Sequence, residues 1–211
     1  MPKNYVHNKK RPLRKGTSEV LILCCGKLEE KYFKRYKKEY CDNKSNIKIK
    51  VNVEKGSPSQ LVKEAIKQKE NNNYNKVYVV FDKDDYPDYN KAIEESEKSS
   101  IGCIYSNEAF EFWIYLLHLN EDTNRPIGRV ELNDKIAKCF FGSEKYKKDD
   151  KCYEELMKKI FDSKGTKLEK AEEIADRGWQ KHKKEYPNDP SQWCSSTNVF
   201  KLTRYLREWK D

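Results

Sequence analysis

Residues Lys76–Asp85, with the sequence KVYVVFDKDD, carry the clearest structural signal in the chain. Its apolar run from Val77 to Phe81 is β-branched or aromatic throughout, which favours a strand. The run contains no polar break, and this is typical of a parallel strand covered on both faces by helices. The run ends in Asp82, Asp84 and Asp85, at the carboxyl edge where open α/β sheets bind their ligands.

Carboxylates so close in sequence repel one another unless something neutralises them. A divalent cation would do so, and hard oxygen ligands suit Mg²⁺ or Mn²⁺. A solvated acidic turn leading to Pro87 explains the same residues equally well. The stretch alone therefore leaves both interpretations open.

The composition of the 211-residue chain is that of a charged globular protein, with 36% hydrophobic and 37% charged residues. It is long enough to bury a core. The net charge of +9 favours a polyanionic partner such as nucleic acid, although the general enrichment in lysine accounts for part of that charge. The seven cysteines form no C-x-x-C pair, and neither a secretory segment nor a membrane-length apolar run is apparent, so we expect a cytoplasmic protein with reduced thiols and no membrane association.

Strands are expected near residues 19–25, 46–53, 76–82 and 101–105, each followed by a helix. Residues 46–53 alternate between apolar and polar side chains, which predicts a strand near the sheet edge. The sequence from Ser57 to Gln60 predicts a capped helix start. This β-α order implies a mostly parallel sheet with helices on both faces.

The chain divides into three predicted parts. Residues 1–18 form a basic arm, which can lie along phosphates through Lys10, Arg11 and Arg14 or remain a solvated terminus. Residues 19–120 form the α/β core. Residues 121–211 show helical patterns and no clear strand, and they form a helical extension packed on the core.

Further acidic residues stand near the predicted sheet edge. Glu29 and Glu30 fall in the first turn of the helix after Gly26, where the helix dipole favours acids and where they can also face the crevice beside Asp82. Glu111 lies in an apolar helix that Ser106 and Asn107 are expected to cap, three residues after Glu108. A carboxylate among apolar residues needs a partner, which is either a nearby donor or the acidic crevice.

Four segments, in order, resemble the RloB-like family. Residues 23–33 (LCCGKLEEKYF) resemble its C-E-G-x-T-E-x-x-Y-F opening, and residues 81–84 (FDKD) resemble its D-x-D strand end. Residues 106–118 (SNEAFEFWIYLLH) resemble its S-N-P-x-F-E-x-W helix, and residues 196–202 (STNVFKL) resemble its S-T-x-V-x-x-L segment. The resemblance implies a Toprim-like fold, Mg²⁺-dependent chemistry on phosphodiester bonds, and a role in restriction-linked or abortive-infection (AbiL-type) phage defence beside an AAA/ABC-type ATPase.

The resemblance also implies the site residues. Asp82 and Asp84 would hold Mg²⁺ or Mn²⁺ and Glu29 and Glu111 would help, so that these four form the catalytic and metal-binding set. Lys27 and Lys83 would contact the phosphates of nucleic acid.

The sequence departs from the family pattern at Cys25, where a glutamate is expected, and at Glu108, where a proline is expected. A thiol is a poor ligand for Mg²⁺. Glu29 or Glu30 would then supply the lost carboxylate, Glu108 and Glu111 would complete the site, or catalysis has been lost.

Two functions follow from these observations. The first is a metal-dependent nuclease effector of an antiphage system, acting on DNA or tRNA. The second is a catalytically degenerate Toprim domain that binds nucleic acid or docks on the ATPase, and Cys25 is its main support. A primase or topoisomerase is disfavoured because the chain has no additional domain. A homodimer is left open.

Overall fold

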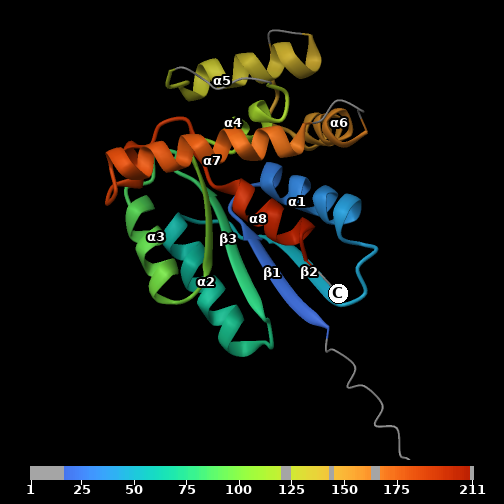
Figure 1. Cartoon of the computed structure of the whole chain (residues 1–211), viewed down its shortest axis with the longest axis vertical. Coiled ribbons are helices and arrows are strands. Elements are labelled where there is room, and N and C mark those ends of the chain that lie inside the picture. Colours follow the sequence, from blue (N-terminus) through green and yellow to red (C-terminus); the bar gives the residue numbers. More distant parts are fainter. Residues whose placement is uncertain (1–16, 120–124, 143–144, 163–166, 210–211) are drawn as a thin grey trace, which may run out of the picture.

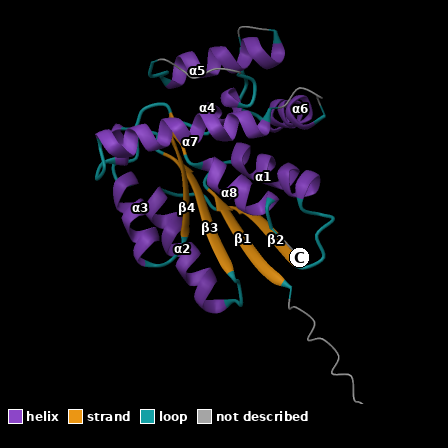
Figure 2. Ribbon diagram, viewed as in Figure 1, coloured by secondary structure: helices purple, strands orange, loops and turns teal. Residues whose placement is uncertain are grey.

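The computed structural model describes residues 17–119, 125–142, 145–162 and 167–209. A five-stranded sheet with the order β2-β1-β3-β4-β5 lies at its centre, with helices around it (Figures 1 and 2). The strands are β1 (Ser18–Cys24), β2 (Ile47–Val53), β3 (Lys76–Asp82), β4 (Gly102–Asn107) and β5 (Ser196–Thr197). The pairs β1–β2, β1–β3 and β3–β4 are parallel and β4–β5 is antiparallel. The prediction of a mostly parallel α/β sheet is confirmed.

Helices connect the parallel strands and continue beyond them. They are α1 (Lys27–Tyr40), α2 (Pro58–Asn71), α3 (Tyr89–Lys98), α4 (Glu111–Leu116), α5 (Arg129–Ile136), the π-helical turn η1 (Ala137–Phe141), α6 (Asp150–Phe161), α7 (Leu168–Glu185), the 3₁₀ turn η2 (Pro190–Gln192) and α8 (Val199–Arg207). Among the described helices, none is long and apolar enough to cross a membrane.

The two faces of β3 explain its unbroken apolar run. Successive side chains of a strand point to opposite faces. The Tyr78 ring contacts Tyr205 of α8 on one face, and the Phe81 ring contacts Tyr89 of α3 on the other. Both faces of β3 are therefore covered, as the sequence predicts. Asp82 has the same parity as Tyr78 and so falls on the face that α8 covers.

The edge strand and the start of α2 also follow the sequence. In β2 the apolar side chains are buried and the alternating Lys48 and Lys50 are exposed. The capping box of α2 is present, with Ser57 and Gln60 each bonding the other's backbone. Asp88 strengthens this helix start by accepting bonds from the Ser57 hydroxyl at 2.6 Å and the Ser59 amide at 3.1 Å.

The expectation of no strand after residue 120 is wrong. Ser196 and Thr197 form β5 against the end of β4, with Thr197 Oγ1 2.9 Å from Ser106 Oγ. Beside β5, the Asn198 side chain accepts from the Tyr105 amide and donates to the Cys103 carbonyl, so it satisfies the outer edge of β4. Two polar residues held by side-chain bonds carry no hydrophobic periodicity that a strand prediction could detect.

The expected helix cap at Ser106 and Asn107 is also wrong. Both residues belong to β4, and α4 begins at Glu111 with no side-chain cap. The Asn107 amide donates instead to the carbonyls of Pro190 and Ser191 at 3.2 and 2.9 Å. These two polar residues thus connect the sheet to the chain around η2, although in the sequence they look like a helix cap.

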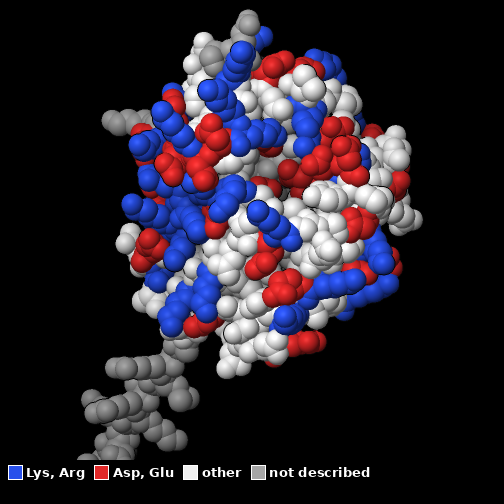
Figure 3. Space-filling model, turned by 180° about the vertical axis from the view of Figure 1, so that it is seen from behind, with Lys and Arg blue, Asp and Glu red and all other residues white. Residues whose placement is uncertain are grey.

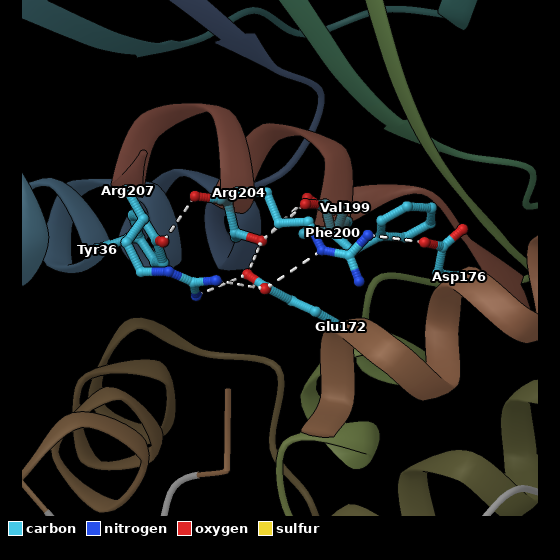
Figure 4. A network of polar contacts seen from close by, with 8 residues as sticks. Tyr36, Glu172, Asp176, Val199, Phe200, Arg204 and Arg207 are labelled. Atoms are coloured by element: carbon cyan, nitrogen blue, oxygen red, sulfur yellow. Dashed lines mark hydrogen bonds and ion pairs between the residues drawn. The ribbon is translucent and has the colours of Figure 1, made fainter. Parts of the chain in front are cut away.

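A buried ion-pair network joins α7 to α8 (Figure 4). Glu172 is 1% exposed. Its carboxylate accepts from the two terminal nitrogens of the Arg207 guanidinium, at 3.0 and 2.7 Å, and from the Thr203 hydroxyl at 2.7 Å. Arg204 lies 3.5 Å from the same carboxylate and 2.7 Å from Asp176. The Tyr36 hydroxyl of α1 donates to the Thr203 carbonyl at 2.8 Å. These contacts hold the carboxyl-terminal helices on the α1 side of the sheet.

Candidate functional site

The carboxyl ends of β1 and β3 lie under the layer of carboxyl-terminal helices (Figure 1). At the end of β1, Gly26 allows the Glu29 side chain to fold back over the turn, because a Cβ at position 26 would lie only 2.4 Å from Glu29 Oε2. Glu29 is 5% exposed as a result. The first turn of α1 thereby directs a carboxylate to the edge of the sheet where β3 delivers Asp82.

Three carboxylates meet at this edge, from three elements. Asp82 is the last residue of β3, Glu29 lies in the first turn of α1, and Glu111, 4% exposed, is the first residue of α4. We call Glu29, Asp82 and Glu111 the acidic cluster. Asp82 Oδ1 is buried and has no hydrogen-bond partner among the described residues. An unpaired carboxylate oxygen inside a protein is costly, so this atom calls for a proton or a cation.

The electrostatics of the acidic cluster reflect this crowding. Burial, with the charge of Glu111, raises the pKa of Glu29 to about 7, although its own backbone bond and Lys148 act in the opposite direction. Burial, with the charges of Glu29 and Glu111, raises the pKa of Asp82 well above its usual range. Such shifts from desolvation and like charge are typical of functional sites, and structural ion networks also produce them.

Two cations from the carboxyl-terminal part of the chain form ion pairs with acids at this edge of the sheet. Lys148 Nζ lies 2.7 Å from Glu111 Oε1. Arg129, the first residue of α5, lies 3.0 Å from Asp84 Oδ1 and also donates to the Glu108 carbonyl at 3.2 Å. Asp84 has a left-handed backbone (φ 41°) and its amide bonds the same Glu108 carbonyl. The turn after β3 therefore directs Asp84 to Arg129.

Cys25 does not replace the glutamate expected at its position. Its thiol donates to the Gly56 carbonyl at 3.3 Å. Burial, followed by the charges of Glu29 and Asp82, raises the pKa of Cys25 to about 12. In the metal-free protein the Cys25 thiol is therefore protonated, whereas the thiolate is the form that binds metals and attacks electrophiles. Glu29 is the carboxylate that reaches the edge of the sheet beside it.

The other predicted site residues have different surroundings. Glu30 pairs with Lys34 at 2.7 Å and with Lys27 at 3.4 Å, so Lys27 is engaged along the surface of α1. Lys83 lies in the turn after β3, where its amide donates to the Ser106 carbonyl. Lys10, Arg11 and Arg14 lie outside the described residues.

The surface around the edge of the sheet carries both signs of charge. Figure 3 views the molecule from behind and shows acidic side chains around a hollow in its upper half, beside a broad area of Lys and Arg. The hollow lies at the height at which the central strands end in Figure 1. An acidic recess bordered by cations suits a phosphate-containing ligand held together with a divalent ion.

The carboxylate oxygens at this edge are suitable ligands for a divalent ion, but they are not arranged to bind one. Within the described residues, no three His, Cys, Asp or Glu side chains form a ready-made metal site. Lys148 pairs with Glu111 and Arg129 pairs with Asp84 at this edge of the sheet. The buried carboxylates and the unpartnered Asp82 oxygen are nevertheless the hard oxygen ligands that Mg²⁺ and Mn²⁺ prefer.

Sequence reasoning missed three residues beside the acids. Arg129 and Lys148 belong to no motif and lie far from the acids in sequence, so only the tertiary structure reveals them. Tyr86 is 37% exposed, and its pKa is raised by burial and then by the nearby Cys25, Asp84, Asp88 and Asp82. The signal in the sequence was an aromatic residue directly after Asp84 and Asp85.

Comparison with known proteins gives one match. A family model described as RloB-like protein matches residues 20–206, which is most of the chain. No curated protein and no solved structure matches.

Proposed function

Because the chain belongs to the RloB-like protein family, we propose that it is a Mg²⁺- or Mn²⁺-dependent nuclease with a Toprim-like fold. Its substrate is DNA or tRNA, and its setting is an antiphage abortive-infection system. The observation that carries this proposal is the acidic cluster, in which the buried carboxylates of Glu29 and Glu111 and the half-buried Asp82 lie at the carboxyl edge of the sheet, with one Asp82 oxygen buried and unpartnered. Open α/β sheets bind their ligands at this edge.

The residues of the acidic cluster suit phosphodiester hydrolysis. Asp82, Glu29 and Glu111 would hold the divalent ion, and Asp84 would join them if it left Arg129. When bound, the ion supplies charge neutralisation at the phosphate and activation of a water molecule. In the metal-free protein burial and the charge of Glu111 raise the pKa of Glu29 to about 7, and a bound divalent ion would lower it again, so that Glu29 would be ionised as a metal ligand.

The cations around the acidic cluster would bind the phosphate of the substrate. Arg129, Lys148, Lys27 and Lys83 lie on or beside the elements that carry the acids, and positive side chains there stabilise the phosphate of a nucleic acid. The net charge of +9 favours the approach of a polyanion. The family relationship supports an AAA/ABC-type ATPase as partner, a cytoplasmic location and no membrane association, and it leaves a homodimer open.

A specific observation favours a second function, that of a degenerate binding module. Cys25 is protonated and bound to the Gly56 carbonyl, and no ready-made metal site exists within the described residues. A domain that had lost catalysis would keep its basic surface and bind nucleic acid or the ATPase without cutting. Glu29, buried next to the missing glutamate, is the reason we favour the nuclease.

The test is cleavage of single-stranded DNA, duplex DNA and tRNA with Mn²⁺, with the ATPase partner present. Three proteins are compared: wild type, Asp82→Asn and the control Asp85→Asn, which removes an exposed carboxylate from the same turn. We expect wild type and Asp85→Asn to cut one substrate and Asp82→Asn to bind it without cutting. If all three bind nucleic acid and none cuts, and Cys25→Glu also fails to cut, the binding module replaces the nuclease.

A further inference from the structure

Lys148 is the residue on which the further inference rests. It reaches the acidic cluster from the irregular residues 145–149 before α6, and its amine lies 2.7 Å from Glu111 Oε1. We infer that Lys148 is a built-in counter-ion that takes the position of a cation at Glu111 in the metal-free protein and competes with the divalent ion there. The inference rests on the proposed metal site and assigns the residue that sets its affinity.

The need for such a counter-ion follows from the burial of Glu111. A carboxylate that is 4% exposed cannot remain ionised without a cation or several donors, because desolvation penalises its charge. Lys148 also lowers the pKa of Glu29, so its charge reaches a second member of the acidic cluster. One lysine thus stabilises two carboxylates that a metal ion would otherwise hold.

The exposure of Lys148 makes it exchangeable. Its side chain is 38% exposed while that of Glu111 is 5% exposed, so the lysine enters from the solvent side and can return to water. The neighbouring Asp149 accepts from the Cys152 amide at 2.8 Å and caps α6 independently of Lys148. Withdrawal of Lys148 therefore leaves the start of α6 in place.

Arg129 differs from Lys148 in this respect. Its guanidinium pairs with Asp84 and also donates to the Glu108 carbonyl. Two bonds in different directions fix a planar guanidinium more firmly than one bond, with a 6.0 Å contact to the Tyr146 ring, fixes the flexible Lys148 ammonium. Arg129 is thus the more firmly held of the two cations, and Lys148 is the cation that yields to the metal at Glu111.

Replacement of Lys148 therefore has two opposite effects. It leaves Glu111 buried without its cation, which lowers the stability of the metal-free protein. It also removes a positive charge that repels and displaces the divalent ion, which strengthens metal binding. In the variant the metal ion no longer has to displace a charged hydrogen bond. The free energy of such a bond corresponds to a roughly tenfold change in metal affinity. A lysine that only supported the structure would give the first effect without the second.

The experiment measures Mn²⁺ binding to the full chain by titration calorimetry at constant neutral pH, with thermal unfolding in parallel. Lys148→Met is compared with wild type and with Lys147→Met, which removes the same charge from the adjacent exposed residue. We expect Lys148→Met to bind Mn²⁺ roughly tenfold more tightly, to melt at a lower temperature without metal, and to show a larger upward shift with Mn²⁺. Lys147→Met should behave as wild type.

If Lys148→Met does not fold, Lys148→Gln keeps a donor to Glu111 without the charge and gives the same comparison. Unchanged or weaker Mn²⁺ binding in the Lys148 variant, with measurable binding in wild type, overturns the inference and leaves the metal site standing. Absence of Mn²⁺ binding in all variants overturns both. Tighter binding without any nucleic-acid cleavage supports the inference and counts against the nuclease.

Discussion

Glu29→Gln should stabilise the metal-free protein at alkaline pH and leave it unchanged at acidic pH. The pKa of this carboxyl rises from an ordinary value of 4.5 to about 7 because burial and the charge of Glu111 oppose its ionisation. The folded state therefore binds more protons than the unfolded state between these two values. Stability falls as the pH rises through this interval and is constant above it.

The magnitude follows from the same values. A rise from 4.5 to about 7 corresponds to about 3 kcal/mol. This is the stability that wild type loses between pH ~4.5 and pH ~7 through Glu29, and glutamine has no charge to penalise. Because Glu29 is 5% exposed, solvent screening does little to reduce the effect. We expect Glu29→Gln to exceed wild type by about 2 to 3 kcal/mol at pH ~8 and to equal it below pH ~4.

The assay is urea unfolding of both proteins in a chelator over this pH range. Glu30→Gln is the matched control, since this neighbouring carboxyl is bonded by Lys34 and Lys27. Partial burial acts to raise the pKa of Glu30, but these bonds outweigh it and lower the pKa. Glu30→Gln should therefore lose stability at neutral pH. Parallel pH profiles for wild type and Glu29→Gln would refute the assignment of Glu29 to a crowded, buried cluster.

Three further predictions test other parts of the structure. Glu172→Gln should lower the free energy of unfolding by about 3 kcal/mol in urea because it leaves two arginines without a buried carboxylate, and an equal loss for the exposed Glu173→Gln would contradict this. Tyr86→Ala should weaken binding of single-stranded oligonucleotides by about 1 to 3 kcal/mol through lost base stacking, as measured by fluorescence anisotropy, and an equal effect of the exposed Tyr186→Ala would show that its position beside the acids is irrelevant. Cys25→Glu should increase Mn²⁺-dependent cleavage in a nuclease assay because a carboxylate replaces a protonated thiol, and unchanged rates would show that Glu29 already fills that role.

The sequence predicted the elements that depend on interactions between residues close together in the chain. The apolar run of β3, the alternation in β2 and the capping box at Ser57 each depend on residues within one element, and the structure has all three. The order of strands and helices then determined a parallel sheet, because crossover connections allow few alternatives. The position of Asp82 at the carboxyl end of β3 followed from the same reasoning.

What the sequence could not provide depends on contacts between distant residues. The strand β5 is formed by two polar residues whose partners lie in β4, so no periodicity marks it. Ser106 and Asn107 resembled a helix cap, and only the fold shows that their side chains bond Thr197 and the chain around η2. Lys148 and Arg129 lie far from the acids in sequence, and no local pattern distinguishes them from other cations on the surface.

The most direct test of the central claim is anomalous diffraction from a crystal soaked in Mn²⁺. The claim is that the acidic cluster is a divalent-cation site. It predicts one anomalous peak about 2.1 Å from Asp82 Oδ1 and within coordination distance of Glu29 or Glu111, with Lys148 withdrawn from Glu111. A crystal that binds Mn²⁺ elsewhere, or not at all, while Lys148 remains paired with Glu111 would contradict it.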